Sequence, residues 1–411
     1  MRSKVKLAIV TDNPPVRADV KAWGMCRVNT RLFRALSENI VIIISGSQRY
    51  MYSSKDLDDN TRARCIIGSS IPTIIKQIGV VFPTIINEEL EFKINLSRYL
   101  KKIHNSSANW IFCPCGVNPH SLYRGIRLAQ ACNLPIAVYL VDDFLSGAEL
   151  SGDTATLRTA QQDIPLWLKQ VDQIFVISDG LKSRIRNLYN LDSVVLPLPY
   201  ALGSYDKPPG NSLEQTGTDQ EVIFVGNLSH FYTDGLKQMA QTVDEINSTL
   251  GSNIKLRLTL PSIKDAQHKI GHYDCIKCKP CVDNLDLYHA IHSSILCFAP
   301  YSFREDYKIM VSTSFPSKIL DYLSAARHIL ILGPPYATSV NYFNKNQLNT
   351  VLTSENPKKI REIIIRQLND NMEYSNKYRE VVWQNHDPKQ VALQIISTLE
   401  SHAHPCRGRG E

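Results

Sequence analysis

The densest run of chemically capable residues is Ser314-Phe-Pro-Ser-Lys318, with Asp321 one helical turn beyond the lysine. Pro316 suits the first turn of a helix, because the N–H that proline lacks would have no helical partner there. The unpaired amides of such a turn and the helix dipole favour a phosphate group, and Lys318 adds a positive charge. Asp321 projects to a similar face, where its carboxylate can accept hydrogen bonds from ribose hydroxyls. The run predicts a nucleotide site; the alternative is an ordinary helix start with an exposed Lys/Asp pair.

A second group of polar residues follows apolar segments in the first half of the chain. Asp142 and Asp143 come directly after Ile136–Val141. The carboxyl ends of parallel strands face the ligand in open α/β sheets, so one of these two carboxylates is a candidate general base. The alternative is a pair of loop or helix-capping aspartates. His120 is a weaker candidate, and Gly24 could let a ligand approach the backbone closely.

Apolar periodicity predicts the elements that must position these residues. Strand-like and helix-like segments alternate, which is typical of a parallel sheet with helices on both faces. We expect strands at 6–11, 40–45, 110–114, 136–141, 173–177, 221–225, 255–260, 294–299 and 329–332, and helices at 29–38, 121–132, 181–189, 234–250, 286–293, 316–325, 357–369 and 388–401.

The alternation stops once, in a stretch rich in Gly, Pro, Ser and Thr. We therefore predict two Rossmann-like domains that face a central cleft, with a C-terminal helix crossing back to the first domain. The predicted segments are an acceptor domain at 1–202, a linker at 203–220, a donor domain at 221–380, the returning helix at 381–401 and a loose tail at 402–411.

The block from Ser314 to Pro335 resembles the donor-site helix of GT-B-fold glycosyltransferases, in particular the group-1 or family-4-like bacterial transferases. Residues 222–227, 282–301, 176–182 and 139–144 are similar to other segments of that family in order and spacing. The resemblance implies transfer of a sugar from a UDP- or GDP-sugar to a glycan or lipid-linked acceptor, in surface polysaccharide or cell-envelope glycan synthesis. The donor-binding residues it implies are Gly226, Asn227, Tyr301, Ser314, Pro316, Ser317, Lys318 and Asp321.

The chain departs from the family pattern at the glutamate pair of the retaining enzymes, where Thr313 and Asp321 stand instead. Both stereochemical routes therefore stay open. An inverting enzyme needs a base such as Asp142 or Asp143, whereas a retaining enzyme relies on positioning and on Lys318 to stabilise the departing diphosphate. Arg304 and Lys308 are further cations for the phosphates. A sugar-nucleotide epimerase or hydrolase and a non-catalytic nucleotide-sugar-binding protein are the alternative functions.

Charge and composition limit the surroundings of the protein. The net charge of +7 comes from the first 200 residues, which hold 24 Lys and Arg against 17 Asp and Glu. Such a half could contact an anionic membrane surface; no nucleic-acid partner is expected, because no basic cluster is interleaved with aromatics. No segment has the roughly 18 apolar residues of a membrane span, and the ten cysteines form no disulfide framework. We expect a cytoplasmic protein, peripheral on the membrane at most.

No cofactor or metal is expected at the cleft. One metal alternative remains open, since Cys275, Cys278 and Cys281 follow His272 at three-residue intervals and Cys and His are the ligands of structural zinc. Partly buried thiols are the default interpretation of the same residues.

Overall fold

The structure is a computed structural model of the chain. It describes residues 5–15, 25–45, 57–59, 64–67, 84–152, 154–200, 220–260, 264–280, 284–325, 328–348, 351–369 and 376–402. The chain divides into two compact units. Among the described residues, unit 1 holds those up to 199 and those from 388 on, and unit 2 holds residues 200 to 387.

Unit 1 is built on a parallel sheet of seven strands in the order β3-β2-β1-β4-β5-β6-β7. The central strands are continuous apolar runs with every residue buried, as expected for strands that helices cover on both faces. The strands are β1 (Leu7–Thr11), β2 (Ile40–Ser45), β3 (Cys65–Ile67), β4 (Trp110–Cys115), β5 (Ile136–Leu140), β6 (Gln173–Val176) and β7 (Val194–Val195).

The helices of unit 1 end where the sequence offers a left-handed cap, as at Asn133 and Asn190, which both have positive φ. Ser178 caps the start of the helix that follows β6, since its hydroxyl accepts from Leu181 N at 3.0 Å. The helices are α1 (Met25–Ala35), α4 (Thr84–His104), α5 (His120–Cys132), α6 (Phe144–Ser151), α7 (Thr154–Gln162), α8 (Ile164–Leu168), α9 (Asp179–Tyr189) and α18 (Pro388–Ser401).

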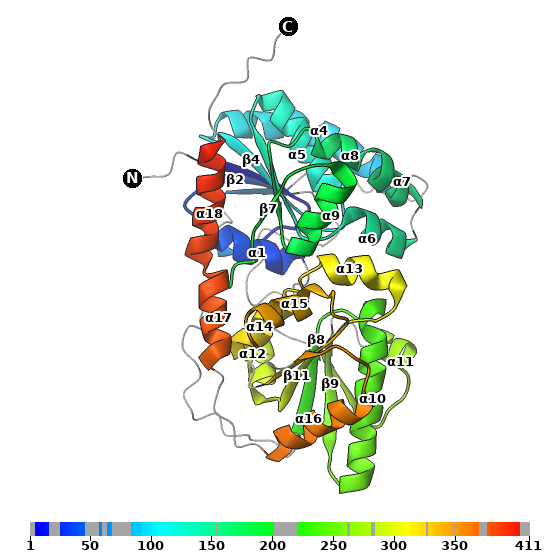
Figure 1. Cartoon of the computed structure of the whole chain (residues 1–411). Coiled ribbons are helices and arrows are strands. Elements are labelled where there is room, and N and C mark those ends of the chain that lie inside the picture. Colours follow the sequence, from blue (N-terminus) through cyan, green and yellow to red (C-terminus); the bar gives the residue numbers. More distant parts are fainter. Residues whose placement is uncertain are drawn as a thin grey trace. The chain divides into compact units, whose positions relative to one another are not determined.

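Unit 2 repeats the pattern with six parallel strands in the order β10-β9-β8-β11-β12-β13. Figure 1 shows helices on both sides of each sheet. The strands are β8 (Gln220–Val225), β9 (Ile254–Leu260), β10 (Ile276–Pro280), β11 (Leu296–Pro300), β12 (Ile329–Leu332) and β13 (Val351–Leu352). The helices are α10 (His230–Leu250), α11 (Lys264–Ile270), α12 (Asn284–Ser293), the 3-10 turn η1 (Glu305–Tyr307), α13 (Lys308–Thr313), α14 (Lys318–Ala325), α15 (Thr338–Lys345), α16 (Pro357–Asn369) and α17 (Asn376–His386).

Each sheet has a point where the strand order reverses, and such a switch point is where open α/β sheets bind ligands. In unit 1 it lies between β1 and β4, and in unit 2 it lies between β8 and β11. Helix α10 comes very close to the second switch point: a Cβ on Gly235 would lie 2.4 Å from Pro300 Cβ at the end of β11. The helix can approach the strand this closely only because residue 235 is glycine.

The α/β class and the returning C-terminal helix are confirmed. Pro388 begins α18 at a position that suits proline, and the helix packs against α1 of unit 1 while Gln394 Nε2 donates to Val195 O at 2.9 Å. The predicted returning segment 381–401 holds two helices, because α17 ends at His386 within unit 2. Most of the predicted linker, 203–219, lies outside the described residues.

Five predicted helix starts were wrong by two residues or more. Helices α9 and α12 begin at Asp179 and Asn284, two residues before the predicted 181 and 286. Helix α1 begins at Met25 rather than Asn29. Helix α10 begins at His230, four residues before the predicted Asp234. Helix α14 begins at Lys318, so Pro316 precedes the helix, and its carbonyl accepts the first helical hydrogen bond from Ile319 N at 3.0 Å.

Candidate functional site

The loop after β8 opens the site of unit 2. Gly226 has φ +124°, a backbone conformation that side-chain-bearing residues rarely adopt, and its N–H donates to Thr259 O at 3.1 Å. Asn227 is exposed. Two residues on, Ser229 precedes the 21-residue helix α10 without a side-chain hydrogen bond to its first turn. The loop therefore presents a helix N-terminus whose amides have no side-chain cap.

Lys318 is the unusual residue of this site. Its side chain is buried, at 7% exposure, and Nζ lies 3.9 Å from the ring centroid of Phe224 and 3.7 Å from that of Tyr232. Within the described part of the chain, Nζ has no hydrogen-bond partner. A Cβ on Gly226 would lie 3.7 Å from this nitrogen, so the glycine loop and the ammonium are neighbours.

Burial without a partner makes the Lys318 ammonium costly. Removing a charge from water costs several kcal/mol, and the two aromatic faces return only about 1–2 kcal/mol. Burial accordingly lowers the pKa of Lys318 well below its ordinary value. An anion at the glycine loop would supply the missing countercharge, and the first amides of α10 would bind it as well.

Two further groups border the lysine. Tyr322 fixes α14 over the switch point, since its hydroxyl accepts from Val225 N at 2.9 Å and donates to Phe298 O at 3.3 Å. Lys269 of α11 reaches the glycine loop, where Nζ donates to Leu228 O at 3.1 Å. Sequence reasoning missed Lys269, because nothing in the spacing of α11 relates it to a loop some 40 residues earlier.

The other predicted donor residues take different places. Asp321 lies half-buried on α14, one turn after Lys318. Ser314 ends α13, with Oγ 3.0 Å from Met310 Sδ. Pro316 and Ser317 join the two helices. Tyr301 is a core residue, since its ring is buried and its hydroxyl lies 2.8 Å from Ser339 Oγ. We infer that Tyr301 supports the end of β11 rather than touching a ligand.

Arg304 and Lys308, the further cations expected for the phosphates, lie in the segment after β11. Both are exposed. Arg304 pairs with Asp306 at 2.8 Å, and Lys308 pairs with Glu305 at 2.8 Å. Exposed ion pairs of this kind contribute little to stability, because water and salt screen them. Neither cation carries the burial that sets Lys318 apart.

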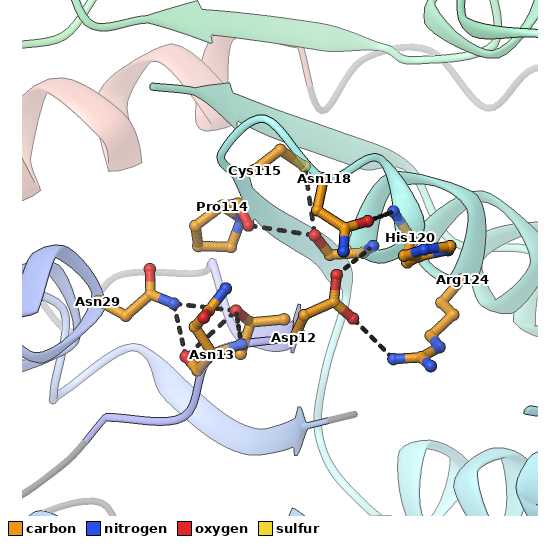
Figure 2. A network of polar contacts seen from close by, with 10 residues as sticks. Asp12, Asn13, Asn29, Pro114, Cys115, Asn118, His120 and Arg124 are labelled. Atoms are coloured by element: carbon orange, nitrogen blue, oxygen red, sulfur yellow. Dashed lines mark hydrogen bonds and ion pairs between the residues drawn. The ribbon is translucent and has the colours of Figure 1, made fainter. Parts of the chain in front are cut away.

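At the switch point of unit 1, a polar network joins the ends of β1 and β4 (Figure 2). The carboxylate of Asp12 pairs with Arg124 Nη1 at 2.7 Å and accepts from Ser121 N at 2.9 Å, so it caps α5 from outside the helix. Asn29 of α1 holds the same loop, because its Nδ2 donates to Thr11 Oγ1 at 2.9 Å and to Asn13 O at 2.6 Å. The network therefore fixes the loop after β1 against α1 and the start of α5.

The network was missed from the sequence, although one signal was available. Asp12 and Asn13 follow the apolar run of β1 directly, and polar residues at the carboxyl end of a buried strand are positioned for a site. The partners Arg124 and Asn29 could not be found in this way, because they come from helices distant in sequence.

The two carboxylates after β5 have different roles. Asp143 is 2% exposed and caps α6: its carboxylate accepts from Ser146 N at 3.0 Å and from the Ser146 hydroxyl, with Arg184 Nε 3.5 Å away. The capping alternative therefore describes Asp143, and the prediction of a base at this position is withdrawn. Asp142 is half-buried. Its Oδ2 would lie 3.8 Å from a Cβ added to Gly116, so its carboxylate lies close to the loop that follows β4.

His120 begins α5, and its N–H donates to Asn118 Oδ1 at 3.1 Å (Figure 2). It follows β4, next to β5 in the sheet, so topology brings His120 and Asp142 to the same edge. Gly24 lies outside the described residues.

Metal ligands were also considered. Among the described residues, no group of three His, Cys, Asp or Glu side chains could hold a metal ion. Cys275 is buried, its thiol donates to Ala240 O, and burial raises its pKa to about 12, while Cys281 lies outside the described ranges. An Asp-x-Asp motif does occur, at Asp56-Leu57-Asp58, but Asp58 is buried and pairs with Arg34 at 2.6 Å.

Comparison with solved structures decides the fold. The chain matches sucrose-phosphate synthase from Thermosynechococcus elongatus with a TM-score of 0.70 and 12% identity, over 96% of this chain and 98% of that one. The chain has the GT-B fold. It also matches the UDP-forming α,α-trehalose-phosphate synthase from Burkholderia xenovorans in complex with glucose-6-phosphate (TM-score 0.62, 11% identity, 96% and 100% covered).

A third GT-B neighbour is HepE of Anabaena in complex with UDP-glucose, with a TM-score of 0.63 and 12% identity over 96% of this chain and 99% of that one. No protein-family model and no curated protein matches the sequence. The GT-B fold accounts for both Rossmann-like units and for α18, which returns to unit 1.

Proposed function

We propose that the chain is a glycosyltransferase that moves a sugar from a nucleotide-sugar to a hydroxyl of a glycan or lipid-linked acceptor. The observation that carries the proposal is Lys318, whose buried side-chain nitrogen lies beside the glycine loop of a GT-B unit and has no hydrogen-bond partner among the described residues. The fold adds support, since its neighbours include two sugar-phosphate synthases and a protein in complex with UDP-glucose.

In this proposal the diphosphate of the donor lies between Lys318 and the first turn of α10. The departing diphosphate gains negative charge during transfer, and a cation already desolvated nearby stabilises it without reorganising. Asp321, one turn further, is the residue for the ribose hydroxyls. The first position of the glutamate pair is Thr313, which has no carboxylate. Its side chain is buried, and its hydroxyl donates to Ile309 O at 2.8 Å.

The chemistry is tested by incubating the protein with UDP- and GDP-sugars and lipid-linked or oligosaccharide acceptors, followed by product analysis. A glycosylated acceptor and released UDP or GDP are expected. Hydrolysis of the donor to a free sugar would indicate the hydrolase alternative. Conversion of the donor to an epimer would indicate the epimerase alternative. Nucleotide binding without turnover would indicate a binding protein. We propose surface polysaccharide or cell-envelope glycans as the setting, which rests on the sequence resemblance.

Asp142 is the residue we assign to the acceptor hydroxyl in an inverting transfer. Asp142→Asn should lower the transfer rate on the order of 100- to 10,000-fold with donor affinity unchanged. The matched variant Asp143→Asn should cost about 1 kcal/mol of stability, because hydrogen bonds to a charged carboxylate become bonds to a neutral amide, and should leave turnover within a few-fold. Full activity of Asp142→Asn, with retained anomeric configuration in the product, would contradict the role of the base.

Unit 1 also offers a surface for an anionic membrane. Residues 92–141 contain no Asp or Glu, and α4, which packs against α5, exposes Lys93, Arg98, Lys101 and Lys102 together with Ile94 at 57% exposure. Among the described residues, no helix is long and apolar enough to span a membrane. We propose peripheral contact on the cytoplasmic membrane face, where each basic residue contributes about 1 kcal/mol near anionic lipid.

Vesicle co-sedimentation checks the membrane contact. The protein should bind phosphatidylglycerol-rich vesicles and not phosphatidylcholine vesicles. Lys101→Glu/Lys102→Glu should reduce that binding at least tenfold. The control is Lys358→Glu/Lys359→Glu, an equally exposed lysine pair on α16 of unit 2, which should have little effect. Equal losses from both pairs would show a general charge effect and not a surface on α4.

A further inference from the structure

A cluster of three rings, of Phe315, His386 and the half-buried Tyr342, lies just before the loop that carries Lys318. Phe315 packs with its ring centroid 6.1 Å from that of His386, nearly parallel at 19°, and 5.0 Å from that of Tyr342. His386 is 2% exposed, and its Nε2 lies 2.7 Å from the Tyr342 hydroxyl. The cluster brings together the loop before α14, helix α15 and the last residue of α17.

The cluster is held on its other sides by polar contacts. The carbonyl of His386 accepts from Tyr200 N at 2.8 Å, and Asn385 Nδ2 donates to Asn346 Oδ1 at 2.8 Å. Helix α17 also packs along α14. His386 is therefore fixed by its backbone, its ring nitrogen and its ring face, which makes it a rigid support for Phe315.

The position of Phe315 decides where Lys318 lies. Only two residues separate them, and Pro316 restricts the backbone of the residue before it. Helix α14 starts with the bond from Ile319 N to Pro316 O. The Lys318 ammonium is seated 3.7 and 3.9 Å from two ring centroids, and a shift of the loop of about 1 Å would be enough to misplace such a group.

We propose that His386, hydrogen-bonded to Tyr342, is a positioning residue that holds Phe315 and thereby seats the Lys318 ammonium for the donor diphosphate. The inference rests on the proposed function and adds to it a residue 68 positions further along the chain. His386 acts through Phe315 and the loop, so its contribution is confined to the recognition of phosphate.

The test measures affinity for UDP and GDP, with uridine and guanosine as phosphate-free probes, in Tyr342→Phe and His386→Phe. Both variants keep the rings and lose the hydrogen bond between them. We expect each to weaken diphosphate binding about 5- to 20-fold and to leave nucleoside binding unchanged. Tyr342→Phe also removes the bond that Asn385 Nδ2 donates to the Tyr342 hydroxyl at 3.4 Å, so the double variant should be no weaker than Tyr342→Phe alone.

Tyr288→Phe is the matched control, since Tyr288 is a buried tyrosine of the same unit whose ring contacts are with His289 and His292 on its own helix. It should not alter the ratio of diphosphate to nucleoside affinity. If Tyr342→Phe lowers the melting temperature but keeps that ratio at the wild-type value, the cluster is only structural and the inference is wrong. Should His386→Phe fail to fold, Tyr342→Phe decides alone. A wild-type chain that binds neither nucleotide would overturn the proposed function itself.

Discussion

Lys318→Met should weaken nucleotide-diphosphate binding and, at the same time, make the protein more stable. The ammonium supplies charge-assisted hydrogen bonds worth about 1.5–3 kcal/mol to the diphosphate, so affinity should fall on the order of 10- to 100-fold. In the unliganded protein the same ammonium is buried without a partner. An apolar side chain of similar length removes that cost and should stabilise the fold by about 1–4 kcal/mol.

Calorimetric titration and thermal unfolding check both halves of this prediction. Lys345→Met is the control, since Lys345 is an exposed lysine on α15 of the same unit and its loss should change stability by less than about 0.5 kcal/mol. A Lys318→Met protein that is destabilised, or that binds UDP and GDP as the wild type does, would contradict the placement of the phosphates. Opposite signs of the two effects are characteristic of a residue kept for binding.

Nucleotide binding should take up a proton at alkaline pH. Burial holds the pKa of Lys318 well below 10.5 in the free protein, and a bound diphosphate favours the charged form and raises that pKa again. Between the two pKa values, the complex holds a proton that the free protein lacks, so affinity should fall as pH rises through this window. Above about pH 8 the nucleotide phosphate itself is fully ionised. The proton taken up from the buffer therefore binds to the protein and not to the nucleotide.

The same shift fixes the sign of the stability effect. Between the lowered pKa of the folded state and 10.5, the unfolded chain binds the proton that the folded chain lacks, so wild-type stability rises with pH across this window. The advantage of Lys318→Met should therefore be largest below the lowered pKa and shrink toward pH 10.5. Titrations in buffers of different ionisation enthalpy should show net proton uptake on nucleotide binding within this window; zero uptake throughout would refute a low pKa for Lys318.

The sequence predicted the inner strands because buried parallel strands are continuous apolar runs, as in β1 and β5. The edge strands β3, β7, β10 and β13 were not predicted. Helix starts were less predictable. Pro316 looked like a first helical residue, yet the ring packing of Phe315 before it delays α14 until Lys318. Local preference was overruled by a tertiary contact that spacing does not reveal.

The sequence singled out some residues of the candidate site but did not reveal what surrounds them. Lys318 was identified from its neighbours in the chain, but its burial depends on Phe224 and Tyr232 from β8 and α10. Asp142 and Asp143 were indistinguishable in sequence, and only the bonds of Asp143 to Ser146 separate them. Pairings between residues that follow neighbouring strands, such as Asp12 after β1 with Arg124 of α5 after β4, depend on strand order. The sequence does not reveal that order.

Direct titration of the intact protein with UDP, GDP, UDP-glucose and the nucleosides uridine and guanosine tests the central claim. We predict saturable binding of one of the two diphosphates at a single site, with its nucleoside bound at least tenfold more weakly, because the Lys318 ammonium recognises phosphate. Failure of every nucleotide to bind, or equal affinity for a diphosphate and its nucleoside, would contradict it.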